Sequence, residues 1–320
     1  MTVRLTVNRV AWNNHVRATA TSYGDGLVTV VKGNGYGFSR PVLHAATAEL
    51  GATRVCVGTT HELHDVPVGL TPIVLTPTLT APHDTRPVLT VGSVEHVRAL
   101  TGWRGNVMVK LASSMRRYGV TPQELMPLLT AIEAAGLHLA GFALHLPLAG
   151  DDAARLSEID QWMPLLPPTG ELWVSHMRPE TFRALRAQHP DRTLRIRVGT
   201  ALWHGIPRGE FLRLTADVVQ TQPVRAGDVA GYFHTTVSGD GTLVALGAGS
   251  SHGVALLDDA DPDRRSPFHF ERRRLRLLER PHMHTSLVLV PDGQPCPTLG
   301  DDVDVQRPLI TTTIDELRWT

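Results

Sequence analysis

The stretch GLVTVVKGNGYGFS, residues 26–39, joins a run of apolar and β-branched residues to a turn with three glycines. Residues 27–32 have the composition of a short buried strand, and the apolar residues of 40–50 recur at helical spacing. A strand, a glycine-rich turn and a helix in this order form one βα unit of a parallel sheet. The predicted strand ends on a lysine, Lys32.

Lysine is rare in this chain. The 31 basic residues are 29 arginines and two lysines, Lys32 and Lys110, and both lysines follow apolar, strand-like runs. A guanidinium stays protonated, whereas an ammonium group can lose its proton and form an imine with an aldehyde. The two lysines are therefore predicted to lie at positions that need an amine able to lose its proton, which arginine cannot supply.

Repetition of the βα pattern predicts an α/β fold with an N-terminal (β/α)8 barrel of the TIM type. Apolar strand-like runs alternate with amphipathic segments until about Pro207, and eight strands is the number that closes such a barrel. The predicted strands are residues 27–32, 54–59, 71–76, 86–91, 105–111, 139–146, 172–175 and 194–199.

The sequence pattern changes after Pro207, where short strand-like runs alternate with turns such as SGDG and PDGQ. This pattern predicts a C-terminal all-β domain. The predicted domains are residues 1–208, the barrel, and residues 209–320, the β domain.

Composition narrows the class of protein. The 320 residues are 42% hydrophobic and 19% charged, which is typical of a globular chain rather than a disordered one. The 31 acidic residues balance the 31 basic ones, so a nucleic-acid partner is not expected. No run of eighteen apolar residues and no export signal is found, so neither membrane insertion nor secretion is expected. Cys56 and Cys296 match no redox or metal-ligand spacing, and a cytoplasmic location without a metal fits them.

Basic and polar residues gather at the predicted carboxyl ends of the barrel strands, where barrel enzymes place their active sites. The residues expected there are Lys32, Lys110, Arg117, His145, Ser175, His176, Arg197, Gly199 and Thr200. Such a set indicates an anionic ligand that offers an aldehyde, a phosphate and an aromatic ring. Pyridoxal 5'-phosphate has all three.

These residues resemble motifs of the alanine racemase family, the two-domain members of the fold type III pyridoxal-phosphate enzymes. VVKGNGYGFS resembles the family block V-V-K-A-N-A-Y-G-H-G, which implies that Lys32 is the Schiff-base lysine and Tyr36 a phosphate contact. VKLASSMRRYGV resembles the segment L-K-x-D-T-G-M-x-R-L-G. This second match implies that Lys110 is the lysine that is often carbamylated. It also implies that Arg117 binds the cofactor phenolate and the substrate carboxylate.

Two further blocks extend the resemblance along the barrel. GFALHLPLAGD is similar to G-x-x-T-H-F, which implies that His145 packs on the pyridine ring. RIRVGTALWHG is similar to R-x-G-x-x-L-Y-G, which implies that Arg197 faces the pyridine nitrogen and that Gly199 and Thr200 neighbour the phosphate. The resemblance also implies a head-to-tail homodimer, in which the β domain of each subunit completes the active site of the other.

The β domain departs from the family pattern. LGAGSSHGV has Ala248 where the family places its catalytic tyrosine. In PHMHTSL the substrate-side Met283 remains, but His284 replaces an aspartate. His252 and His284 are the candidates for a replacement base, because an imidazole titrates near neutral pH. Tyr232 is a weaker candidate.

Three functions stay open at this point. The first is an amino-acid racemase that interconverts L- and D-enantiomers, with Lys32 as one base. The second is another pyridoxal-phosphate reaction on a larger amino acid, such as epimerisation, decarboxylation or lyase chemistry, because the altered pocket is more cationic. The third is a non-catalytic protein that binds the cofactor.

Overall fold

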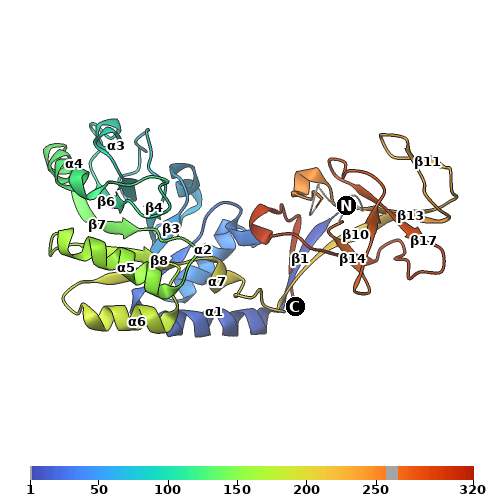
Figure 1. Ribbon diagram of the computed structural model, residues 1–320, viewed down its shortest axis with the longest axis horizontal. Coiled ribbons are helices and arrows are strands. Elements are labelled where there is room, and N and C mark those ends of the chain that lie inside the picture. Colours follow the sequence, from blue (N-terminus) through green and yellow to red (C-terminus); the bar gives the residue numbers. More distant parts are fainter. Residues whose placement is uncertain (1, 257–265) are drawn as a thin grey trace. The chain divides into compact units, whose positions relative to one another are not determined.

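The computed structural model describes residues 2–256 and 266–320. The chain divides into two compact units (Figure 1). The barrel unit comprises Asn14–Gly35 and Ser39–Ile206. The β unit comprises Met1–Asn13, Tyr36–Phe38 and Pro207–Thr320.

Eight parallel strands close the barrel, and each strand pairs with its neighbours in chain order. They are β2 (Leu27–Val30), β3 (Arg54–Val57), β4 (Thr71–Val74), β5 (Val88–Val91), β6 (Asn106–Leu111), β7 (His138–Leu144), β8 (Glu171–Ser175) and β9 (Leu194–Val198). All eight predicted strands are present, so the predicted (β/α)8 barrel is confirmed. Strand β2 ends two residues before Lys32, which places that lysine in the turn that follows the strand.

The helices of the barrel unit lie outside the ring of strands (Figure 1). They are α2 (Arg40–Glu49), α3 (Val94–Ala99), α4 (Pro122–Ala134), α5 (Asp152–Trp162), α6 (Pro179–Gln188) and α7 (Thr200–Trp203), with the 3-10 turns η1 (Gly24–Gly26), η3 (Thr60–Asp65) and η4 (Met163–Leu165). The 3-10 turn η2 (Gly35–Gly37) begins in the barrel unit at Gly35 and continues in the β unit. Local signals start several of the helices. Thr121 and Glu124 form a capping box at the start of α4, and Ser93 caps α3 through the N–H of His96.

The helix α1 (Arg9–Tyr23) precedes the first barrel strand and was not predicted. Its sequence carries Asn, His, Arg, Thr and Ser at most positions, so its apolar stripe is weak. Trp12 and Val16, four residues apart, are nevertheless buried and supply the packing face of the helix.

The β unit is built on a sheet of nine strands, which confirms the predicted all-β region. Its core strands β10, β13 and β17 are antiparallel. The sheet strands are β1 (Val3–Val7), β10 (Leu212–Val224), β13 (Gly241–Leu246), β14 (Phe268–Phe270), β15 (Arg273–Arg274), β16 (Arg276–Leu277), β17 (Ser286–Pro291), β18 (Asp302–Val305) and β19 (Glu316–Trp319). A small ribbon, β11 (Val229–Ala230) with β12 (Thr235–Thr236), and the turns η5 (Ser250–His252) and η6 (Leu309–Thr311) complete it.

The first residues of the chain lie in the β unit. Strand β1 pairs antiparallel with β10 and parallel with β19. Val3, Leu5 and Val7 are buried, because their side chains alternate toward the core of the β unit. The sequence-based division had placed this segment with the barrel in 1–208. Its second limit, near residue 208, lies next to the change of unit at Pro207.

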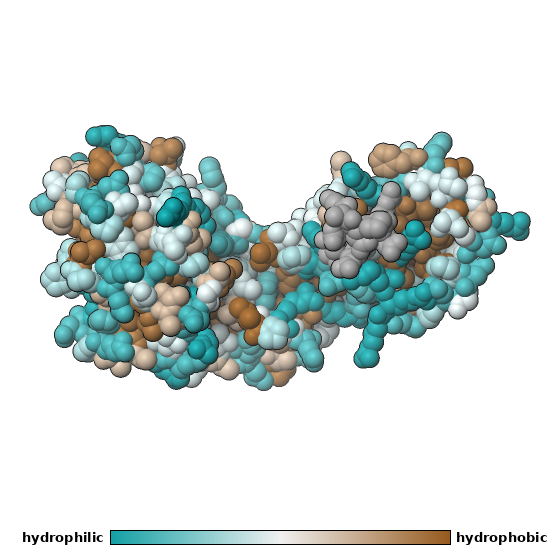
Figure 2. All heavy atoms as spheres, in the orientation of Figure 1, coloured by the Kyte–Doolittle hydropathy of each residue, from teal (hydrophilic) through white to brown (hydrophobic). Residues whose placement is uncertain are grey.

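The described surface is mainly polar. In Figure 2, apolar atoms are scattered among polar ones over the visible face of the barrel unit. Across residues 2–256 and 266–320, no helix is both long and apolar enough to span a membrane.

Candidate active site

Lys32 lies in the turn after β2, at the carboxyl end of the barrel. Its carbonyl oxygen accepts a hydrogen bond from the N–H of Gly35 at 3.1 Å, and its side chain is exposed. Partial desolvation and the neighbouring guanidinium groups of Arg117 and Arg197 lower the pKa of Lys32. A lysine with a lowered pKa is a better nucleophile and a better base at neutral pH.

Arg197, near the end of β9, is the buried cation of this site. Its Nη2 donates to the carbonyl of Leu144 at 2.8 Å, and burial lowers its pKa. Arg117 is exposed in the loop after β6, and its guanidinium lies 4.5 Å from the centre of the Tyr118 ring. Arg117 affects the pKa of both lysines. The charges of both arginines therefore lower the pKa of Lys32.

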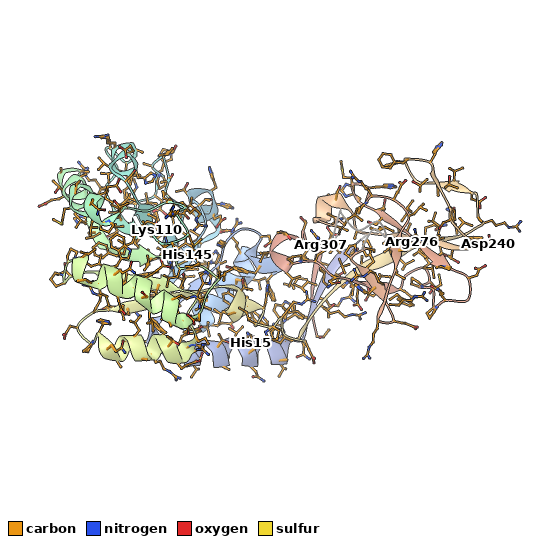
Figure 3. The ribbon with its side chains drawn as sticks, viewed as in Figure 1. His15, Lys110, His145, Asp240, Arg276 and Arg307 are labelled. Carbon is orange, nitrogen blue, oxygen red and sulfur yellow. The ribbon has the colours of Figure 1, made fainter. Side chains whose placement is uncertain are left out.

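Lys110 is buried inside the barrel unit, and only 4% of it is exposed. Burial, together with Arg197 and Arg117, lowers the pKa of Lys110 from 10.5 to about 5. Its side chain lies close to His145 (Figure 3), and its charge lowers the pKa of that histidine. The Lys110 amine is therefore neutral at pH 7.

His145, directly after β7, is fixed by a buried serine. The hydroxyl of Ser175 lies 3.0 Å from Nδ1 of His145 and accepts the N–H of Leu146 at 3.1 Å. Burial, Arg197 and Lys110 lower the pKa of His145 to about 2, so the ring is neutral. The ring of His176 packs edge to face against the ring of His145, with the ring centres 4.9 Å apart. His176 also has a φ of 61°, in the left-handed region that non-glycine residues seldom occupy.

The remaining predicted cofactor contacts lie at two short helical turns. Gly199 caps α7, and Thr200 is its exposed first residue. Tyr36 is buried and has a φ of 56° within η2, and it groups with the β unit.

Sequence reasoning missed the residues that hold the Lys32 turn. Glu62 and Asp65, both in η3, and Arg40 at the start of α2 surround Gly33. The sequence GTTHELHD does place two acidic residues soon after a predicted strand. Acidic residues three positions apart are equally common on exposed loops, so this spacing alone did not indicate that they hold the Lys32 turn.

In the β unit, His252 is buried and both of its ring nitrogens have partners. Nδ1 accepts the N–H of Gly249 at 3.1 Å, so Nε2 carries the proton and donates it to Asp315 at 3.1 Å. This arrangement occupies both nitrogens and fixes one tautomer. His252 has the contacts of a structural residue.

His284 is exposed, and its tautomer is fixed in the opposite sense. The hydroxyl of Ser251 donates to the carbonyl of Met283 at 2.7 Å and lies 2.9 Å from Nδ1 of His284. Because the serine proton is directed at Met283, Nδ1 of His284 must be the donor to the serine oxygen. The lone pair of the neutral ring is therefore on Nε2. Ala248 is fully buried, and its carbonyl accepts the hydroxyl of Ser286.

The predicted site residues therefore form two groups. One group lies at the carboxyl end of the barrel and comprises Lys32, Lys110, Arg117, His145, Ser175, His176, Arg197, Gly199 and Thr200. The other group lies in the β unit. His252 and His284, whose ring centres are 5.9 Å apart, and Met283 are near one another there.

Comparison with known proteins places this geometry in context. Residues 7–207 match the family model described as alanine racemase, N-terminal domain. No curated protein matches the sequence. Among solved structures, alanine racemase from Bartonella henselae with covalently bound pyridoxal phosphate is 17% identical. The alignment covers 100% of both chains with a TM-score of 0.76.

Two further structures share the fold. Alanine racemase from Bacillus anthracis with bound L-Ala-P is 21% identical over 95% of this chain and 85% of its own, with a TM-score of 0.73. Histidine racemase from Leuconostoc mesenteroides subsp. sake is 18% identical over 100% of this chain and 97% of its own, with a TM-score of 0.71. The barrel and the β unit are thus both parts of a known two-part fold.

Proposed function

The chain belongs to the alanine racemase family, and from this premise we propose that it is a pyridoxal-phosphate-dependent amino-acid racemase. The observation that supports this most is the position of Lys32. It is an exposed lysine at the carboxyl end of the first barrel strand, with its pKa lowered by partial desolvation and then by Arg117 and Arg197. An amine of this kind is suited to bond an aldehyde and then to move a proton.

The residues at this end of the barrel fit pyridoxal phosphate. Burial and, after it, neighbouring cations lower the pKa values of Lys32, Lys110, His145 and His176, the last to about 4. The repulsion among these basic groups would be relieved by an anion of high charge density. Pyridoxal phosphate joined to the nitrogen of an amino acid would withdraw electrons from the α-carbon and make the α-proton acidic.

Each barrel residue then has a proposed task. Lys32 would hold the cofactor until the amine of the substrate displaces it, and the lysine amine freed in this way would exchange a proton with one face of the α-carbon. Arg117 would bind the substrate carboxylate and the cofactor phenolate. Arg197 would lie near the pyridine nitrogen, where a guanidinium cannot accept a proton. Neutral His145 would contact the ring. The proposed phosphate contacts are Tyr36, Ser175, His176, Gly199 and Thr200.

Lys110 is proposed to be carbamylated. A neutral amine is the form that adds carbon dioxide, and the pKa of about 5 keeps Lys110 neutral at pH 7. The resulting carbamate is an anion, so it would offset part of the positive charge of Arg117 and Arg197. This pairing would hold Arg117 ready for the substrate carboxylate.

We propose His284 as the second base. Its lone pair is on Nε2, because Ser251 holds the proton on Nδ1, and its side chain is exposed. His252, whose nitrogens are both occupied, is proposed to support the loop that carries Ser251. A racemase needs a second group to act on the opposite face of the α-carbon, and an exposed imidazole suits that task.

The active form is proposed to be a cytoplasmic head-to-tail homodimer, in which His284 and Met283 of one subunit complete the barrel site of the other. The substrate is a free amino acid, and the product is its enantiomer. Closed two-fold assembly is the commonest arrangement of such chains.

Exchange of the α-proton in deuterated water tests this function. The cofactor-loaded protein is incubated with a panel of L- and D-amino acids, and the mass and chirality of each sample are measured. Deuterium uptake with formation of the opposite enantiomer is expected for at least one amino acid. A product whose mass changes by more than the incorporated deuterium would assign a different reaction, and bound cofactor without exchange would assign a non-catalytic role.

Two variants of Lys32 sharpen the result. Lys32→Ala is expected to lose exchange and to regain part of it when methylamine is added, because the small amine replaces the missing base. Lys32→Arg keeps the charge but fills the space, so methylamine is expected to leave it inactive. Unchanged exchange in either variant would remove Lys32 from the mechanism.

Mixing two inactive variants tests the shared site. In heterodimers of Lys32→Ala with His284→Ala, one site contains both native residues and the other contains neither. Random pairing then restores about a quarter of the wild-type activity. Sites made within one chain would regain nothing on mixing.

A further inference from the structure

The turn that carries Lys32 is held at Gly33 from two sides. The N–H of Gly33 donates to Oε1 of Glu62 at 3.0 Å. The carbonyl of the same residue accepts Nη1 of Arg40 at 2.7 Å. Gly33 has a φ of 60°, so the chain direction changes directly after the lysine. Both polar groups of this one peptide residue are thus fixed by side chains of opposite charge.

Glu62 also fixes the end of the next strand. Its second oxygen, Oε2, accepts the N–H of Gly58 at 2.7 Å, directly after β3. A Cβ atom at Gly58 would lie 3.0 Å from Oε1 of Glu62, so glycine allows this close approach. One carboxylate therefore ties the ends of β2 and β3 together, and Lys32 is attached to the first of them.

The second support comes from the same helical turn. One oxygen of Asp65, Oδ2, accepts both Nε of Arg40 at 2.8 Å and Nη2 at 2.7 Å. Arg40 is thereby aimed at the carbonyl of Gly33. The turn η3 thus holds Gly33 directly through Glu62, and indirectly through Asp65, which orients Arg40.

We propose that Glu62 is a positioning residue for Lys32, which holds the lysine turn in place and supplies the negative charge that balances the cations around the amine. This role rests on the proposed function, since that function makes Lys32 the reactive lysine. Glu62 is half-buried, and its two carboxylate oxygens accept the N–H groups of Gly33 and Gly58.

The charged groups around Lys32 show why this carboxylate matters. Arg117 and Arg197 lower the pKa of Lys32, and His176 adds to the cationic surroundings when it is protonated. The Cys56 thiol is neutral, because burial raises its pKa to about 12. Among the described residues that act on the pKa of Lys32, Glu62 is the only carboxylate. Removal of its charge therefore leaves the lysine among cations.

The two lysines of the chain make a direct test practical. Full-length, cofactor-free protein labelled with 13C at Cε of lysine gives one NMR signal for Lys32 and one for Lys110. Titration of the wild type and of Glu62→Gln gives both pKa values. The pKa of Lys32 is expected to fall by about half a pH unit or more in Glu62→Gln, because an opposite charge a few ångströms away is lost. Lys110 is expected to titrate as before.

Glu124→Gln is the matched control. The carboxylate of Glu124 also accepts a backbone N–H, that of Thr121 at 3.0 Å, but it does not act on Lys32. This variant is expected to leave both lysine signals unchanged. A Lys32 pKa in Glu62→Gln that equals the values in the wild type and in this control would overturn the proposal.

A second variant separates charge from position and serves if Glu62→Gln does not fold. Glu62→Asp keeps the charge but is one methylene too short to reach both turns. The pKa of Lys32 is expected to stay near its wild-type value, while the amide hydrogens of Gly33 and Gly58 exchange faster with solvent. Unchanged protection of both amides would refute the positioning role. None of these measurements requires turnover, so a failed racemase assay and a failed Glu62 role are distinguishable.

Discussion

Asp315 joins His252 to the first strand of the chain. Its Oδ2 atom accepts Nε2 of His252 at 3.1 Å and the backbone N–H of Val3 at 2.8 Å. The N–H of Asp315 donates in turn to the carbonyl of Val3 at 2.9 Å. Three segments far apart in the sequence thus meet at one carboxylate, and His252 is held by that junction.

Asp315→Ala is expected to destabilise the protein, because two N–H groups lose their acceptor at once. The expected loss in the free energy of unfolding is about 1–3 kcal/mol, from urea denaturation at pH 7. Asp292→Ala, at an exposed turn, is the control and is expected to change it by less than about 0.5 kcal/mol. Equal stability of the two variants would show that the junction contributes nothing.

His284→Gln is expected to separate proton exchange from racemisation. One enantiomer still loses its α-proton to Lys32, whereas formation of the opposite enantiomer falls about 100-fold or more. Ser251→Ala is expected to give a smaller loss in the same step, because the hydroxyl that fixes the tautomer is gone. His138→Gln, at the amino end of β7, is the control. Equal loss of exchange for both enantiomers in His284→Gln would contradict a two-base assignment.

Lys110→Met is expected to change how stability depends on pH. The pKa of Lys110 is about 5 in the folded chain and 10.5 for an ordinary lysine, so the unfolded chain binds an additional proton between these values. The wild type therefore gains stability as the pH rises through this window. From pH 6 to pH 8 the wild type should gain about 2–3 kcal/mol more than Lys110→Met.

Urea unfolding of the cofactor-free proteins in buffer free of carbon dioxide measures this difference. The methionine has similar length and no charge, so the packing of the barrel interior is largely retained. A wild type and a variant whose stabilities change in parallel with pH would show that Lys110 is not a neutral amine in the folded chain.

Glu279→Gln is expected to loosen the ribbon formed by β11 and β12. Glu279 is only 2% exposed and accepts the N–H groups of Tyr232 and Phe233, the hydroxyl of Thr235 and Nε2 of His282. Burial raises the pKa of Glu279, but these hydrogen bonds outweigh burial and hold the pKa below its usual 4.5.

The stabilisation from a carboxyl with a depressed pKa is present above pH 4.5 and is lost as the pH falls through the folded value. Glu279→Gln should therefore be less stable than the wild type by about 1–3 kcal/mol at pH 7. The gap should narrow as the pH falls below 4.5, in urea denaturation at pH 7 and at acidic pH. Glu271→Gln, in an exposed turn, controls for the loss of one charge.

The barrel could be predicted from sequence because each of its strands is a short, apolar run with a local period. Residues at the ends of those strands, such as Lys32 and Arg197, followed from the rule that parallel strands end on one face. Helix α1 was not predicted, because its few buried residues do not form a clear apolar stripe among its polar residues. Local pattern thus sufficed where the element itself was strongly patterned.

The partners of the site residues could not be predicted. Glu62 lies 29 residues from Gly33, and Asp315 lies far along the chain from both His252 and Val3. Contacts of this kind depend on how loops that are distant in sequence come together in the fold. The local periodicity of the sequence does not indicate this. The assignment of His252 and His284 as equal candidates had the same cause, because only their hydrogen bonds distinguish them.

The pairing of β1 with both β10 and β19 also constrains the order in which the chain can fold during synthesis. Residues 3–7 are made before the barrel unit, whereas their partners at 212–216 and 316–319 are made after it. The whole barrel unit is translated in between, and its own contacts are complete by Ile206. The barrel can therefore fold while β1 waits as an unpaired strand, and closing the β unit is the slow, long-range step. Until residues 212–216 have been made, the unpaired backbone groups of β1 are open to pairing with other strands.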